Sequence, residues 1–205
     1  MDTKKLTLTI VFAALAIALN PSLTYIQLQF PLMPTLIYQV WEIPIIIALL
    51  IISPIAGIAV SLLNTSVLFI IFPGVLPTGP LYNLLATIAM QIGIYAAVTI
   101  GKKIHCRKNP QTNILASIKW LLAATGVGIL TRVAFMSAIL YFALPQPVPI
   151  GYGFDQALTI ATLSIVAVFN ATLALYTIPT SWLIANRVQI ILQLTMPKKI
   201  SGTKN

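Results

Sequence analysis

The residues best able to do chemistry in this sequence are one carboxylate and one guanidinium that both fall among apolar residues. Glu42 is the only glutamate and comes directly before the run IPIIIALL, and Arg132 lies inside GVGILTRVAFMSAIL. A bare charge in an apolar environment costs several kcal/mol, so each of the two needs a partner or a cavity. Arg132 therefore either pairs with a carboxylate, Glu42 or Asp155, or faces a ligand, as intramembrane charges often do.

Two roles for Glu42 stay open. Placed at the start of a helix, just before Pro44, its carboxylate would meet unpaired backbone amides and the positive end of the helix dipole. The same carboxylate could also close the mouth of a pocket against Arg132. The two roles are compatible.

Four apolar segments carry polar residues at helical spacing, in one segment together with a glycine and a methionine on the same face. Residues three or four apart lie on one face of a helix. The groups are Asn83, Thr87 and Gln91; Thr125, Gly128, Arg132 and Met136; Thr159, Thr162, Asn170 and Thr177; and Asn64 alone in a further segment. Each group either makes interhelical hydrogen bonds, at about 0.6 kcal/mol apiece, or lines a pocket. Their occurrence on consecutive segments, with Tyr and Trp near the segment ends, favours a pocket.

The sequence lacks the residue sets that most enzymes need. The only histidine, His105, lies in the basic segment GKKIHCRK, which leaves no metal-binding pair and no Ser/His/Asp set. No glycine-rich phosphate loop is present, and no carboxylate falls in the middle of an apolar segment, as ion-coupled carriers usually require. We therefore expect no catalytic residue, no metal and no cofactor, and a pocket for a small, largely uncharged ligand.

The elements that position these residues are predicted to be membrane-spanning helices. Of the 205 residues, 59% are hydrophobic and 7% charged, with a mean hydropathy of +0.97, whereas soluble domains have about 25% charged residues. Apolar stretches of about 17–25 residues are the length that crosses a bilayer core. The first stretch is predicted to be a retained helix and not a cleaved signal peptide, because no cleavage site follows it. The sequence thus predicts an all-α, multi-pass protein of the cell membrane.

Basic residues mark one side of that membrane. All but Arg132 fall in three groups: Lys4 and Lys5; Lys102, Lys103, Arg107, Lys108 and Lys119; and Arg187, Lys198, Lys199 and Lys204. Cytoplasmic segments carry such an excess, so both termini and the 101–119 loop are predicted to be cytoplasmic. A nucleic-acid-binding face would interleave these cations with aromatic or polar residues, and no such face is found.

Counting spans under this constraint gives six helices in a single domain, residues 1–205. They cover approximately 6–20, 36–52, 55–72, 79–101, 113–143 and 156–190, followed by a cytoplasmic tail, 191–205. The stretch between the first two helices has several prolines and mixed polarity, and its irregular backbone would lack hydrogen-bond partners in lipid. We expect it to be an external loop that covers a pocket.

Ala14 and Ala18 form a small-residue stripe on the first helix. Small residues four apart let another helix approach closely. The stripe packs either against the protein's own bundle or against a partner.

Five segments in order give a resemblance to a known family: FAALAIAL, WEIPIIIALLIISPIAGIAVSLLN, GPLYNLLA, RVAFMSAILYFALP and VFNATLALYTIPTSWL. Together they resemble the substrate-binding S component of energy-coupling-factor (ECF) vitamin transporters, and most closely the riboflavin type. The resemblance covers residues 6–185. It implies a pocket in the external half, under the loop between the first two helices.

The resemblance also implies roles for particular residues. Ala14 and Ala18 match the motif that docks on the transmembrane T component, beneath which the ATPase subunits lie. The family has asparagines that match Asn83 and Asn170, and its riboflavin-type members usually have an acidic residue at the position of Glu42. Two departures concern the pocket wall, since Leu63 and Leu173 stand where the family usually has lysine.

The expected function is therefore capture of a vitamin-like small molecule, with riboflavin or a related heterocycle as the leading ligand, for ATP-driven uptake by partner subunits. Aromatic residues would cover the apolar faces of the ligand and polar residues its edges. The expected substrate-binding residues are Tyr38, Trp41, Glu42, Asn64, Tyr82, Asn83, Thr87, Gln91, Arg132 and Asn170. The alternatives are a scaffold protein of a cell-envelope complex, whose polar groups only join helices, and a stand-alone facilitator.

Overall fold

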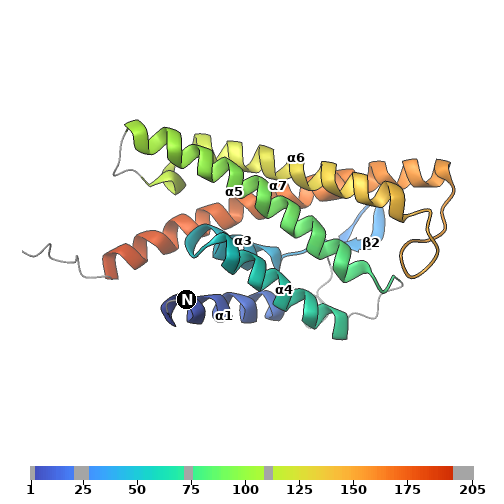
Figure 1. The fold of residues 1–205 in the computed structure, drawn as a ribbon, viewed down its shortest axis with the longest axis horizontal. Coiled ribbons are helices and arrows are strands. Elements are labelled where there is room, and N and C mark those ends of the chain that lie inside the picture. The colour runs from blue at the N-terminus through green and yellow to red at the C-terminus, as the bar shows by residue number, and fades with distance from the viewer. Residues whose placement is uncertain (1–2, 21–27, 72–75, 109–112, 196–205) are drawn as a thin grey trace, which may run out of the picture.

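The computed structural model describes residues 3–20, 28–71, 76–108 and 113–195 as an elongated bundle of helices with one small hairpin (Figure 1). The elements, in chain order, are α1 (Thr3–Ala18), β1 (Gln29–Phe30), β2 (Met33–Ile37), α3 (Glu42–Ile51), α4 (Pro54–Ile71), α5 (Gly79–Lys108), the 3-10 turn η1 (Ile114–Ala116), α6 (Ile118–Ala143) and α7 (Gln156–Thr195).

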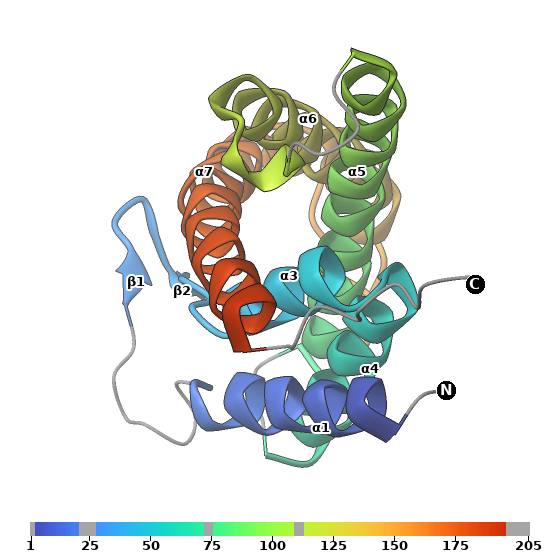
Figure 2. The ribbon, with the colours of Figure 1, turned by 90° about the vertical axis from the view of Figure 1, so that its left-hand side faces the viewer.

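The bundle has two parts that share α3. Helices α5, α6 and α7 pack in that order, and α3 packs against both α7 and α4. Seen end-on, α3, α5, α6 and α7 lie around a common axis, while α1 lies at the outer edge against α3 and α4 (Figure 2). Residues far apart in sequence, on α3, α6 and α7, are therefore brought together inside the first part.

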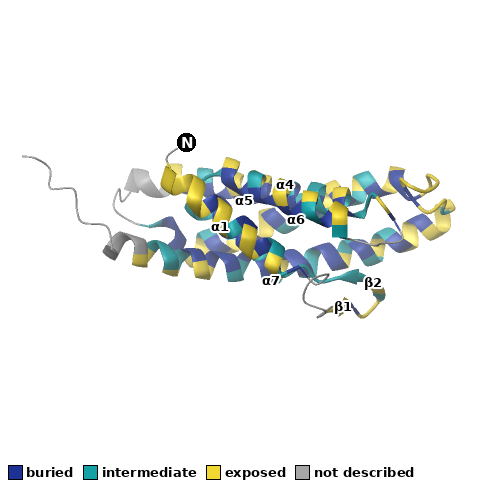
Figure 3. Ribbon diagram, turned by 90° about the horizontal axis from the view of Figure 1, so that it is seen from below, coloured by how far each residue is buried: buried dark blue, intermediate teal, exposed yellow. Residues whose placement is uncertain are grey.

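Four helices are long and apolar enough to cross a membrane: Pro54–Ile71, Gly79–Ile104, Ile118–Ala143 and Gln156–Ile191. The described residues contain six α-helices, as predicted, but only four of them meet this criterion for a membrane span, since α1 has 16 residues and α3 has 10. At 1.5 Å per residue α3 is about 15 Å long, roughly half of a bilayer core. The apolar character of the long helices continues on their outer faces, where Ile70 is 84% and Phe142 72% exposed (Figure 3). Such faces suit a lipid environment.

The expected helix 36–52 begins only at residue 42, because the residues before it pair as a strand. Strands β1 and β2 form an antiparallel hairpin in which Phe30 lies opposite Met33 and Gln29 opposite Ile37, and the Tyr38 amide donates to the Leu28 carbonyl at 2.8 Å. The hairpin satisfies backbone groups that an irregular loop would leave unpaired. The external-loop prediction also included residues 21–27, which lie outside the described residues.

Three other helix boundaries differ from those expected by five residues or more. Asn113 starts the turn η1 by accepting a hydrogen bond from the Leu115 amide at 2.9 Å, and Ser117 is extended, so α6 begins at 118 rather than 113. Helices α5 and α7 continue to residues 108 and 195, beyond the expected ends at 101 and 190. Both extensions carry polar residues past the apolar stretch that the prediction was based on.

Candidate ligand-binding site

A buried ion pair joins the start of α3 to the middle of α6. The Nη1 atom of Arg132 lies 2.7 Å from Oε2 of Glu42, and Nη2 donates to Oε1 at 3.0 Å. The two side chains are 1% and 0% exposed. Two parallel hydrogen bonds between a guanidinium and a carboxylate are among the strongest polar contacts in proteins. Of the partners that the sequence left open for Arg132, the structure selects Glu42.

Two more helices complete the network around this pair. The Nε atom of Arg132 donates to Oδ1 of Asn170 on α7 at 2.8 Å, and the Asn170 amide nitrogen donates to the Val166 carbonyl at 3.0 Å. On α5, the Thr87 hydroxyl lies 3.0 Å from Oε1 of Glu42 and 2.9 Å from the Asn83 carbonyl. The network is electrically neutral and spans α3, α5, α6 and α7.

The helical spacing of the sequence explains why these groups meet. Thr87 and Gln91 are one turn apart on the inner face of α5, and Arg132 lies on the buried face of α6 with Thr125, Gly128 and Met136. Glu42 reaches the same level because α3 starts inside the bundle, after the hairpin. Its carboxylate is directed across to α6 and α5, not left bare beside the apolar run that follows it.

Asp155, the other candidate partner for Arg132, has a separate role. Its Oδ1 accepts a hydrogen bond from the Leu158 amide at 2.8 Å at the exposed start of α7. A carboxylate at this position satisfies an otherwise unpaired amide of the first turn. Asp155 is thus a helix cap.

A second polar group lies between α4 and α5. The Gln91 amide nitrogen donates to the Ser61 hydroxyl at 2.8 Å, and a Cβ at Gly57 would lie 2.5 Å from Oε1 of Gln91, so the glycine makes room for this side chain. Asn64, one turn beyond Ser61, is 2% exposed. Its Oδ1 and the Oε1 of Gln91 are buried without a hydrogen-bond partner among the described residues. A buried acceptor left unpaired costs about 1–3 kcal/mol, so both oxygens are available to a ligand or water.

The three aromatic residues expected at the site lie in different places. Tyr38 is half-buried, 3.3 Å from the Thr172 hydroxyl on α7, with its ring against Phe169 and Tyr176. Trp41 is buried on the other side of α3, in a cluster with Ala13 and Ala16 of α1.

Tyr82 belongs to the loop end of the bundle. Its hydroxyl donates to the Ile150 carbonyl at 2.5 Å, and its ring packs in the cluster that contains Phe154. Tyr82 thereby ties the start of α5 to the segment between α6 and α7. None of these interactions of Trp41 and Tyr82 involves Glu42 or Arg132.

Sequence reasoning missed polar residues where α3 meets α7. Ser181 donates to the Ile43 carbonyl at 3.2 Å. One turn earlier lies Thr177, which the predicted stripe already contained. Its hydroxyl is buried and has no hydrogen-bond partner of ordinary geometry among the described residues, and the same holds for Oε1 of Gln39. The available signal was the four-residue spacing of Thr177 and Ser181, which extends the stripe of α7 by one turn.

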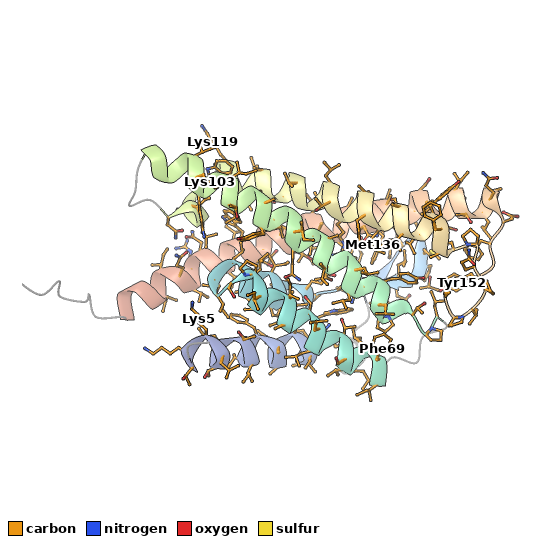
Figure 4. All side chains as sticks on the ribbon, in the orientation of Figure 1. Lys5, Phe69, Lys103, Lys119, Met136 and Tyr152 are labelled. Atoms are coloured by element: carbon orange, nitrogen blue, oxygen red, sulfur yellow. The ribbon has the colours of Figure 1, made fainter. Side chains whose placement is uncertain are left out.

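Three of the lysines lie toward one end of the bundle (Figure 4). Lys5, Lys103 and Lys119 lie toward the same end, whereas Tyr152 and Phe69 lie toward the other (Figure 4).

Ala14 and Ala18 are exposed on α1, while Ala13 and Ala16 face α3 and α4. The face of α1 that carries Ala14 and Ala18 is therefore not covered by the described part of the bundle.

No known protein family matches the sequence, and no curated protein matches it. One solved structure matches the fold, that of the S component of a bacterial ECF transporter, with a TM-score of 0.72 and 21% sequence identity. The match covers 94% of this chain and 99% of that chain. The chain therefore has, over nearly its whole length, the fold seen in an ECF transporter S component.

Proposed function

We propose that this protein is the substrate-binding S component of an ECF-type importer, a multi-pass protein of the cell membrane. The observation that carries the proposal is the neutral network of Glu42, Arg132, Asn170 and Thr87, buried between four helices of an S-component-like fold. A buried ion pair contributes little net stability compared with apolar packing, so a functional role best accounts for it.

The charge balance of the network points to the class of ligand. Glu42 and Arg132 neutralise each other, and a ligand with a net charge would add an uncompensated charge at a buried place. The ligand is then uncharged and carries hydrogen-bonding groups. A vitamin-like heterocycle fits this description, and the resemblance in sequence makes riboflavin the leading candidate.

In this proposal some polar residues contact the ligand, and others position those that do. Asn170, Asn83, Gln91, Asn64 and Arg132 meet the polar edges of the ligand. Glu42, which is itself hydrogen-bonded to Thr87, holds Arg132 in place. Tyr38, on the segment that leads from the hairpin into α3, covers an apolar face. Both termini and the lysine-rich end are cytoplasmic, and the hairpin faces the outside.

Transport then depends on partners. The chain offers no ATP-binding loop, so the energy for uptake comes from ATPase subunits coupled through a T component. The exposed Ala14 and Ala18 face of α1 is the docking surface in this proposal. Uptake by the chain alone, in cells without any such ATPase, would instead indicate a facilitator.

Replacing Asn170 distinguishes ligand binding from a purely structural role. Asn170→Ala removes the acceptor for the Arg132 Nε atom, and we expect the affinity for the ligand to fall about tenfold or more, equivalent to about 1.4 kcal/mol. The measurement is fluorescence quenching of a flavin by the purified variant, with its thermal unfolding recorded in parallel.

Ser164→Ala is the matched control, since Ser164 is an exposed polar residue of the same helix that bonds only within it. We expect this control to keep full affinity. A scaffold protein would show the other pattern, in which Asn170→Ala changes thermal stability and no flavin or other vitamin binds to either variant.

A further inference from the structure

Three lysines converge where the end of α5 meets the start of α6. A Cβ at Gly101 would lie 2.7 Å from two ring atoms of Trp120, so the helices touch at this point. Lys102 and Lys103 follow Gly101 directly, and Lys119 precedes Trp120. The contact therefore places three lysine residues at one helix junction.

All three lysines are exposed and lack an acidic partner. The chain has three carboxylates: Asp2 is outside the described residues, Glu42 is buried with Arg132, and Asp155 caps α7 beyond Tyr152, toward the opposite end (Figure 4). None of the three lysines forms an ion pair with a described residue. The junction is thus a concentrated, uncompensated positive charge.

The side chains beside these lysines are large, apolar and outward-facing. Ile100 and Ile104 are 54% and 51% exposed, and Ile118 and Leu122 are 63% and 65% exposed. Around a membrane-spanning helix such residues meet acyl chains, and a lysine at their border reaches the headgroup level. Trp120, half-buried at the same height, is the residue type enriched at this boundary.

We propose that Lys102, Lys103 and Lys119 form a binding site for the headgroup of an anionic phospholipid at the α5–α6 junction. The ammonium groups contact the headgroup phosphate, and the acyl chains lie along Ile100, Ile104, Ile118 and Leu122. Basic clusters between helices at the cytoplasmic side bind anionic lipids in this way. An acidic partner protein would also meet the charge, but it would leave the flanking apolar residues without a matching surface. This site lies apart from the ligand network and rests on the proposed orientation, in which this end of the bundle is at the cytoplasmic side of the membrane.

The test is a lipid titration of the purified full chain in an uncharged detergent. Bound phosphatidylglycerol is counted by native mass spectrometry for the wild type, for Lys102→Gln/Lys103→Gln/Lys119→Gln, and for Lys4→Gln/Lys5→Gln/Arg187→Gln. The second triple variant is matched, because it removes the same charge at other helices. At about 1 kcal/mol per lysine, about 3 kcal/mol for the three, we expect the first variant to bind the lipid about a hundred times more weakly and the second to stay within about threefold.

Several outcomes would overturn the proposal. Equal weakening in both triple variants would mean general electrostatic attraction without a site, and no weakening in the first would exclude these lysines. Phosphatidylcholine bound as tightly as phosphatidylglycerol would exclude selection of an anionic headgroup. Displacement of the lipid by inorganic phosphate at equal concentration would show a site for soluble anions. Binding of an added acidic protein at these lysines, without binding of the lipid, would show a protein interface. Lys119→Gln alone, expected to weaken binding about threefold to tenfold, keeps the test decisive if the triple variant does not fold.

Discussion

Arg132→Met is expected to lower the free energy of unfolding by about 3–5 kcal/mol, because it leaves the Glu42 carboxylate buried without its partner. The loss would be measured by chemical unfolding of the purified chain in detergent, followed by tryptophan fluorescence. The same variant should lose ligand binding, since Asn170 and Thr87 are held in place by the pair.

The double variant Glu42→Leu/Arg132→Met separates stability from function. Two apolar side chains of similar size can replace a buried ion pair at little cost, so we expect most of the stability to return. Ligand binding should not return, because the polar edge of the site is still missing. A single variant that loses less than about 1 kcal/mol, or a double variant no more stable than the single, would contradict a tightly coupled buried pair.

Ala14→Trp is expected to reduce ATP-driven uptake by about tenfold or more while leaving ligand affinity unchanged. The physical reason is that the exposed small-residue face of α1 is the proposed docking surface, and an indole there would keep a partner helix from approaching closely. A tenfold loss corresponds to about 1.4 kcal/mol of docking free energy. The measurements are uptake of labelled ligand by cells that contain the whole importer and ligand binding by the purified chain.

Leu15→Trp is the control for that experiment. Leu15 is 44% exposed on the same helix, off the line that joins Ala14 and Ala18, and it is already large. We expect it to keep most of the uptake. Equal losses in both variants, or in neither, would place the docking surface elsewhere on the protein.

The polar residues around Arg132 were easier to predict from the sequence than the direction of the aromatic residue Trp41. Counting charges left Glu42 and Asp155 as possible partners of Arg132, and helical spacing put Thr87 and Asn170 on polar faces. The choice of Glu42 came from the structure. The direction of Trp41 did not follow, because it depends on how α3 is rotated about its axis. The structure turns Trp41 toward Ala13 and Ala16 of α1. A short helix offers no stripe long enough to fix that rotation.

The start of α3 shows a second limit of sequence reasoning. Strand β1 has two residues and β2 has five, which is too short for an alternating pattern to stand out. The hydrophobic residues of β2 therefore extended the expected helix to residue 36. Paired with β1, they form the hairpin whose Phe30 packs on Phe169 of α7.

A direct binding measurement is the best test of whether this chain by itself binds an uncharged heterocyclic ligand at the Glu42–Arg132 network. The purified chain is examined for a co-purified yellow flavin spectrum and then titrated with a panel of vitamins, riboflavin first, alongside Arg132→Met. We expect tight, saturable binding of one uncharged member of the panel and its loss in the variant. Absence of binding to every member, or binding that Arg132→Met leaves intact, would contradict this expectation.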